Sequence, residues 1–484
     1  MKKYKLTILI LFTASALLFS ACKKSFLEIT PRGRLVASLT SDYELMLNGA
    51  DLVGTGATAQ GFLGDEIAGF NPFFTASDVR TQRLFKWEAD VQEREQVAPE
   101  MTTFLTWIYR YNKIINEVMD SKGGTEQEKK RIRAEALGNR AFINFFLINY
   151  YAKPYDNTTT ATDPGFPIIT ATDVTETRFE RGTVQAMYDH IISDLTTALD
   201  DLPLTVQHRL RMSRPGAQAL LGKVYVFMGR FNDAIPLFNS CIASLGSAAV
   251  PINLYDYNRE FSTTPTPGVF LPVNQFGPTF PINPDFREGI FIRQAGPGLG
   301  SFTNNALILS PAAASLYIPT DQRRRMFISN PYPTGAVYPM GMLRRFGPGT
   351  IQIGMMLPEI YLLRAECLAR ANNITDAVTD LELLRRNRMP LASAAVPATS
   401  QATSLALLNF IMEERIREFA LLGYRWFDMR RLSVDPLFGQ KTFTHTLYAP
   451  DGSVVETYTS TPERLVLRLP RLVLDQNPGM ENNP

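Results

Sequence analysis

The sequence of 484 residues is poor in the residue types and motifs that most often carry catalysis. It has three cysteines and three histidines, and His190, His208 and His445 stand far apart in the chain. The HExxH, GxSxG, GxxxxGK[ST] and CxxC motifs are all missing, which argues against the zinc-protease, serine-hydrolase, nucleotide-binding and redox classes that they mark. We therefore expect no cofactor and assign no metal-ligating residues, while a hydrolase, which needs just two carboxylates, stays open.

The chain also lacks a strong charge bias and long apolar runs. Lysine and arginine number 49 against 47 aspartates and glutamates, for a formal net charge of +2. Such a balance provides no electrostatic footprint for nucleic acid, so we expect no nucleic-acid partner. No run of 18 apolar residues occurs, which is the length that a membrane-spanning helix needs.

The N-terminus has the pattern of a secretory signal peptide. Three lysines among the first five residues precede an uncharged stretch over residues 6–19, and Ser20 and Ala21 stand directly before Cys22. This order is typical of a bacterial lipoprotein, in which the cysteine thiol takes a diacylglycerol. We predict a signal peptide over residues 1–21, lipid attachment at Cys22 and a flexible tether over residues 22–34. The alternative is an ordinary secreted protein cut near Ala21.

Residues 35–484 are predicted to form one mostly α-helical domain with a few short strands. Apolar residues at helical spacing predict helices over residues 42–48, 99–119, 125–151, 183–202 and 405–422. Thr125 and Glu128 have the spacing of a capping box at the start of the third helix. A hairpin is expected around Pro450-Asp451-Gly452.

Two helix pairs have the spacing of tetratricopeptide repeats. The first is marked by Leu221-Gly222 and Tyr225, a turn at Gly229-Arg230-Phe231, and then Ala234 and Phe238. A weaker copy runs from Tyr361 and Ala365 through a turn at Asn372-Asn373 to Ala377 and Leu381. The small residues allow the paired helices to approach closely. Such pairs cannot bury their apolar faces alone, so we expect the other helices to stack on them.

A loop-rich segment over residues 250–354 separates the two pairs, and an insertion of this length is usually functional. Sugars stack their C–H faces on aromatic rings, and the irregular parts of the chain supply such rings. Candidate ligand contacts are Phe73, Phe74, Tyr255, Tyr257 and Phe280. The alternative is that these rings pack beneath their own loops.

Charged residues and cysteines give further expectations. Asp65 and Glu66 could form the carboxylate pair of a glycoside hydrolase, although adjacency in sequence does not fix their spacing. For the arginine run at residues 323–325, a structural ion pair with Asp321 is favoured over an anion site. Arg425 and Asp428 are spaced to pair with each other along a helix. Cys241 and Cys367 lie on apolar helix faces and are expected to be buried thiols.

Four blocks of the sequence resemble the SusD/RagB family, the surface glycan-binding lipoproteins of Bacteroidetes-type bacteria. They run in family order over nearly the whole mature chain. The blocks are Trp107-Ile108-Tyr109 with Ile114-Ile115-Asn116, Arg133-Ala134-Glu135-Ala136-Leu137, Gly423-Tyr424-Arg425-Trp426-Phe427-Asp428-Met429-Arg430-Arg431, and Leu469-Pro470 with Gln476-Asn477-Pro478-Gly479.

The resemblance implies a tetratricopeptide-like helical core with a loop-rich subdomain and no catalysis. It implies a SusC-like TonB-dependent outer-membrane barrel as partner, to which an oligosaccharide or peptide ligand would be delivered. The expected location is the outer membrane, lipid-anchored and at the cell surface, although Lys23 and Lys24 stand where exported members often have acidic residues. Two alternatives remain open: a lipid-anchored glycan hydrolase, and a scaffold that binds a protein partner in a helical groove.

Overall fold

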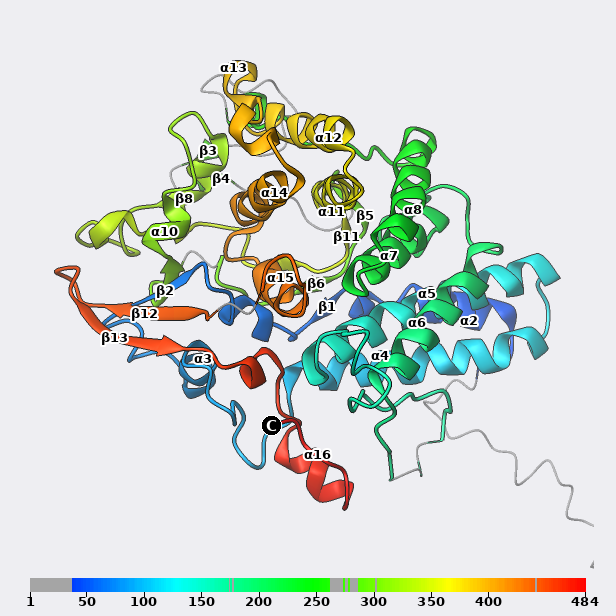
Figure 1. Cartoon of the computed structure of the whole chain (residues 1–484). Coiled ribbons are helices and arrows are strands. Elements are labelled where there is room, and N and C mark those ends of the chain that lie inside the picture. Colours follow the sequence, from blue (N-terminus) through cyan, green and yellow to red (C-terminus); the bar gives the residue numbers. More distant parts are fainter. Residues whose placement is uncertain are drawn as a thin grey trace, which may run out of the picture.

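The computed structural model describes residues 37–173, 175, 178–261, 273–274, 277–278, 286–300, 303–439 and 442–484. Helices make up about half of it, with the strands gathered in the centre and at the left of Figure 1. Two predicted residues, Cys22 and Phe280, lie outside these ranges, so their roles stay predictions. None of the helices in the described part combines the length and the apolar character needed to cross a membrane.

The N-terminal half is a stack of helices around α5 (Glu126–Tyr151). It packs against α2 (Thr40–Leu47), α4 (Pro99–Glu117) and α6 (Val184–Leu199). The predicted capping box begins α5: the Thr125 hydroxyl accepts from the Glu128 amide at 3.2 Å, and the Glu128 carboxylate accepts from the Thr125 amide at 2.6 Å. Packing on three sides explains why α5 is buried from Ala134 to its end.

Both predicted helix pairs are present. The first is α7 (Arg214–Phe227) with α8 (Phe231–Ser244), and the second is α11 (Leu357–Arg370) with α12 (Ile374–Arg386). Gly222 of α7 faces the ring of Phe238 so closely that a Cβ atom there would lie 2.6 Å from it. The second pair packs on the first through α11 and α8, and on α14 (Ser404–Phe419). The tetratricopeptide-like core is therefore confirmed.

Strands from distant parts of the chain form the main sheet, in the order β13 (Val454–Thr459), β12 (Thr444–Tyr448), β2 (Ile67–Phe70) and β7 (Leu307–Leu309). The predicted hairpin is β12–β13, and its partner β2 runs parallel to β12, with Tyr448 opposite Phe70. β7 closes the sheet antiparallel to β2. The sheet thus brings residues near 70, 310 and 450 to one side of the molecule (Figure 1).

Short elements complete the fold. A three-stranded sheet has β6 (Gln294–Ala295) between β1 (Gly54–Thr55) and β10 (Ile351–Gln352). The other strands form two-stranded sheets: β5 (Gly289–Phe291) with β11 (Met355–Met356), β3 (Val273–Asn274) with β4 (Gly277–Pro278), and β8 (Phe327–Ile328) with β9 (Arg344–Arg345). The remaining helices are α3 (Val79–Phe85), α9 (Tyr257–Glu260), α10 (Pro311–Ala314), α13 (Leu391–Ala394), α15 (Tyr424–Ser433) and α16 (Arg471–Gln476).

Buried ion pairs join the loop-rich segment to the C-terminal helices. Arg323 is fully buried and donates to Asp321 at 2.7 Å and to Glu418 at 3.0 Å, which confirms the structural reading of the arginine run for this residue. Arg388 binds the same Glu418. The expected pairing of Arg425 with Asp428 is wrong, because Asp428 binds other arginines of the core. Cys241 and Cys367 are buried free thiols, as predicted.

Candidate functional site: an aromatic edge beside a polar pocket

β2 lies on the left of Figure 1, and aromatic side chains gather at its end. Phe70 contacts Tyr338 edge to face, with 4.9 Å between ring centroids, and it stacks on Phe73 at 6.1 Å with 25° between the planes. Phe73 is 37% exposed. We call Phe70, Asn71, Phe73, Tyr332, Tyr338 and Met340 the aromatic edge. Phe70 and Tyr338 are buried, whereas Phe73, Tyr332 and Met340 are exposed and offer the apolar surface that sugar rings stack on.

Polar groups hold the loop that carries the second half of the aromatic edge. The Asn305 amide accepts from the Tyr332 backbone N–H at 2.9 Å and donates to the Tyr332 carbonyl at 2.9 Å. The Asn71 Oδ1 is buried and has no hydrogen-bond partner among the described residues. Because this atom is enclosed by protein atoms, it does not meet a ligand in this conformation.

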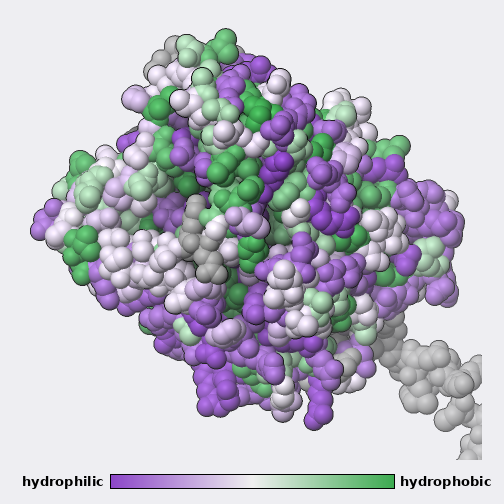
Figure 2. Space-filling model, viewed as in Figure 1, coloured by the Kyte–Doolittle hydropathy of each residue, from purple (hydrophilic) through white to green (hydrophobic). Residues whose placement is uncertain are grey.

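The tip of the β12–β13 hairpin borders the aromatic edge. A Cβ atom on Gly452 would lie 3.1 Å from Pro339, so the two loops touch. Met340 beside this contact is 60% exposed and Val337 is 67% exposed. Figure 2 shows hydrophobic residues at the left margin of the molecule, on the side where these loops lie in Figure 1. Three chain segments therefore build one surface that is partly apolar.

The structure separates the predicted ligand contacts. Phe73 lies on the aromatic edge, whereas Phe74 is 1% exposed and packs against Phe85 at 4.9 Å. Tyr255 and Tyr257 are 2% and 5% exposed, in a buried cluster that includes other residues of the insertion. In this conformation, only Phe73 of these four rings is placed to meet a ligand. Sequence reasoning missed Tyr332, Tyr338 and Met340, because the contacts that place this loop, such as Tyr338 on Phe70, join residues far apart in the sequence.

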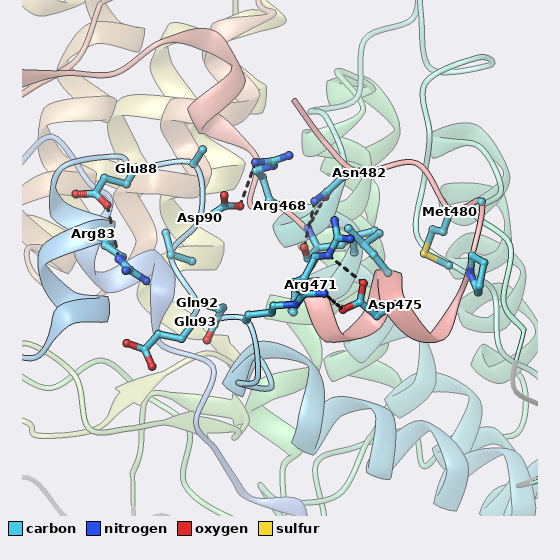
Figure 3. Close-up of a pocket in the computed structure, with 18 residues that line it drawn as sticks. Arg83, Glu88, Asp90, Gln92, Glu93, Arg468, Arg471, Asp475, Met480 and Asn482 are labelled. Carbon is cyan, nitrogen blue, oxygen red and sulfur yellow. Dashed lines mark hydrogen bonds and ion pairs between the residues drawn. The ribbon is translucent and has the colours of Figure 1, made fainter.

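A polar pocket of about 1400 Å³ lies between the loop after α3 and the C-terminal segment around α16 (Figure 3). Arg468 binds Asp90 at 3.0 Å. Asp475 binds Arg471 at 2.9 Å and Arg94 at 3.4 Å. Figure 2 shows mostly hydrophilic residues at the lower margin of the molecule, where α16 lies in Figure 1. The cations of this pocket are balanced by carboxylates, so it suits polar contacts with a neutral ligand or a protein partner.

His445 fixes the start of the loop that lines the polar pocket. Its ring lies between Trp87 and Phe85, with centroid separations of 3.8 and 4.5 Å. Nδ1 lies 2.6 Å from the Phe85 carbonyl and Nε2 lies 2.7 Å from the Gly64 carbonyl. Burial lowers the pKa of His445. The side chain is enclosed by protein atoms, so its role is to hold Trp87 rather than to meet a ligand.

The adjacent carboxyl groups of Asp65 and Glu66 differ in environment. Burial, followed by the charge of Asp65, raises the pKa of Glu66 to about 7. Burial would raise the pKa of Asp65 too, but the guanidinium of Arg425 holds it below its ordinary value. Two carboxyls with separated pKa values can mark an acid–base pair. Glu66, however, is 2% exposed, so a glycosidic bond has no path to it in this conformation.

The described residues contain no group of three or more histidine, cysteine, aspartate or glutamate side chains arranged to hold a metal ion.

Two family models match the chain. The model described as starch-binding proteins associating with the outer membrane matches residues 69–226, and the SusD family model matches residues 350–484. Together they span more than half of the sequence, and the chain belongs to the SusD/RagB family. A comparison with curated proteins finds no match.

Several solved structures share the fold. A SusD superfamily protein from Bacteroides thetaiotaomicron superposes with a TM-score of 0.71 at 22% identity, covering 92% of this chain and 100% of that one. A putative sugar binding protein from Bacteroides vulgatus gives 0.69 at 19% identity, covering 93% and 99%. The surface glycan-binding protein A from Bacteroides fluxus gives 0.66 at 14% identity, covering 92% and 99%. At these identities the likeness establishes the fold alone.

Proposed function

We propose that this protein is a non-catalytic outer-membrane lipoprotein that binds a glycan and delivers it to a SusC-like TonB-dependent transporter. The observation that carries glycan binding is the aromatic edge, where the ring of Phe73 is exposed and stacks on Phe70. Membership of the SusD/RagB family supports the same function. The glycan-binding name of the Bacteroides fluxus neighbour is consistent with it.

A glycan-array screen of the protein without its signal peptide tests the binding step. We expect one class of oligosaccharide to bind and to be recovered unchanged after incubation. A peptide library screened in parallel tests whether the ligand is a peptide. If no glycan on the array binds while a peptide does, the assignment of a glycan as ligand is wrong.

The delivery step requires a stable partner in the outer membrane. Extraction of native membranes in a mild detergent, followed by affinity purification of this protein, should yield a large β-barrel protein. Recovery of the lipoprotein without any barrel partner would count against delivery and would leave glycan binding as a separate function.

The lipid anchor on Cys22 and the tether over residues 22–34 are part of the proposal, with residues 35–484 as the single nutrient-binding domain. Cys22→Ala should release the protein from the membrane fraction and slow uptake while the affinity of the purified domain stays the same. Ser25→Ala, in the same tether, should remain membrane-bound. Protease treatment of intact cells tests exposure at the cell surface, which Lys23 and Lys24 left open.

A glycan hydrolase is the alternative function that would act on the same kind of ligand. The carboxyl pair that such an enzyme would use is Asp65 and Glu66, and Glu66 is enclosed by the core. A shortened product after incubation with the bound glycan would favour the hydrolase. Loss of that product in Glu66→Gln would assign the activity to this pair.

A further inference from the structure

A second pocket, on a different part of the fold, has a cationic lining. It has a volume of about 620 Å³ and lies between the end of α2, the segment before β1, the loop before α7 and the start of β6. Its polar lining consists of Asn48, His208, Arg211 and Arg293, and its apolar lining includes Leu52 and Leu210. The described residues that line it include no aspartate or glutamate. We call it the arginine pocket.

Arg293 brings a buried charge to the arginine pocket without a carboxylate in contact. Its exposure is 2%. Nη1 donates to the carbonyls of Leu210 at 2.9 Å and Ile292 at 2.7 Å, and Nη2 donates to the Asn139 amide oxygen at 2.8 Å. All three acceptors are neutral, so hydrogen bonding is satisfied but the charge is not balanced. A buried guanidinium of this kind is costly unless an anion approaches it.

The carboxylates near Arg293 are already paired with other arginines, among them Arg211. It binds Glu135 at 2.6 Å and Glu44 at 2.9 Å. Arg131 binds the same two carboxylates, at 2.6 and 2.7 Å. Glu44 and Glu135 therefore balance the charges of Arg131 and Arg211, and Arg293 carries the excess positive charge of the cluster. The nearby Asp51 is taken up by Arg110.

Two further facts point to an anion. The Arg211 Nη2 atom is buried and has no hydrogen-bond partner in the described part of the chain. Burial lowers the pKa of Arg293; Tyr111 and Glu135 oppose this shift, while repulsion from the Arg211 guanidinium adds to it. A bound anion would remove this repulsion and give Arg211 its missing acceptor.

We infer that the arginine pocket binds the carboxylate of a small organic acid about the size of a hexuronic acid. Arg293 supplies the excess positive charge, Arg211 supplies the unpartnered donor, and the lining adds the exposed His208 and the apolar Leu52 and Leu210. The volume is within the range of small-molecule sites. The acid is either free or a residue of a larger glycan, and the chemistry that the pocket reads is the same. This inference stands without the aromatic edge.

Calorimetry with the mature protein tests the inference. Glucuronate should bind, and glucose, which has the same ring without the charge, should bind at least tenfold more weakly. Added salt should weaken the binding of glucuronate. Trigalacturonate separates the two sources: if it binds as tightly as galacturonate, the site accepts a glycan residue, and if only the monosaccharide binds, the ligand is a free acid. Equal binding of glucose and glucuronate, binding of inorganic sulfate alone, or no binding at all overturns the inference.

A variant at the lip of the pocket tests the charge balance without a ligand. Ala50 is exposed and lines the pocket, so Ala50→Glu places a carboxylate next to the arginines. It should raise the melting temperature above that of the isosteric Ala50→Gln and reduce glucuronate binding at least tenfold. High salt should remove the difference in melting temperature. Equal melting temperatures with unchanged glucuronate binding would contradict an excess positive charge in the pocket.

Arg211→Gln removes the unpartnered donor directly. Glucuronate affinity should fall at least tenfold, and Arg94→Gln, which removes an exposed arginine at the polar pocket, should leave it unchanged. Because Arg211 also pairs with Glu44 and Glu135, circular dichroism must show that the variant is folded. If it is not folded, the Ala50→Glu and Ala50→Gln pair decides the question alone. Equal losses in Arg211→Gln and Arg94→Gln would mean that the binding is non-specific.

Discussion

Arg425 and Asp65 form a two-point ion pair across 360 positions of sequence, with Nε 2.5 Å from Oδ1 and Nη2 2.9 Å from Oδ2. The pair ties α15 to the turn before β2, and β2 leads directly into the aromatic edge. Asp428, the expected partner of Arg425, binds Arg415 at 2.6 Å and Arg431 at 2.8 Å. The arginine of the most family-like block thus positions the strand that carries the candidate ligand surface.

Removing one member of this pair should cost stability. In Arg425→Gln, Asp65 keeps its charge in a site that is about three-quarters enclosed, so we expect a loss of about 2 kcal/mol, below the full value for a buried pair. Arg471→Gln breaks the exposed pair with Asp475 and should cost less than about 0.5 kcal/mol. Urea denaturation of the two variants measures both. Equal losses would mean that the Arg425–Asp65 pair does not hold α15 to the sheet.

The stability of the protein should depend on the ionisation of Glu66. Its pKa is about 7 in the folded state against an ordinary value of 4.5, so its contribution is fully present below about pH 4.5 and is lost as the pH rises through 7. The loss at high pH is on the order of 3 kcal/mol. Glu66→Gln cannot ionise and should therefore gain stability relative to the native protein between pH 5 and pH 8.

Thermal unfolding of Glu66→Gln and the native protein across this pH range checks the sign. The difference in melting temperature should grow with pH and level off above pH 8. Asp65→Asn provides the opposite case, because the lowered pKa of Asp65 makes its charged form the stabilising one, so this variant should be less stable than the native protein at pH 7. A difference for Glu66→Gln that does not change with pH would show that Glu66 keeps its charge in the core.

The close contact between α7 and α8 should not tolerate a methyl group at Gly222. A Cβ atom there would lie 2.6 Å from the Phe238 ring, so Gly222→Ala forces the helices apart and should cost about 1–3 kcal/mol despite the better helix propensity of alanine. Gly246→Ala, where a Cβ atom meets nothing within 4 Å, should be neutral or slightly stabilising. Chemical denaturation of both variants measures the change in the free energy of unfolding. A neutral Gly222→Ala would mean that the pair adjusts without cost.

The local features of the fold could be predicted because they depend on residues a few positions apart. The capping box at Thr125, the small residues Gly222 and Ala234, and the Pro450-Asp451-Gly452 turn each specify an element from within one short stretch. The parallel pairing of β12 with β2 could not be predicted, because more than 350 positions separate these strands. Sheet register of this kind is set by packing on the core and leaves no local pattern.

The same limit explains the candidate site. Phe73 and Phe74 are neighbours with identical chemistry, and the sequence gives no reason to prefer one. The structure turns Phe74 into the core against Phe85 and leaves Phe73 exposed on Phe70. The excess charge of the arginine pocket was equally hidden, because it depends on which carboxylates reach Arg293 after folding.

The two adjacent phenylalanines should therefore separate binding from stability. Phe73→Ala removes an exposed ring from the aromatic edge and should weaken the glycan identified on the array about tenfold, which corresponds to about 1.4 kcal/mol, with little change in unfolding. Phe74→Ala empties a buried position and should cost about 3–5 kcal/mol of stability. Tyr109→Ala, at an exposed ring on α4 that is 42% accessible, is the matched control and should change neither. Calorimetric titration and denaturation of the three variants measure both effects. Unchanged glycan affinity in Phe73→Ala would remove the aromatic edge as the ligand surface, while family membership and the fold would stand.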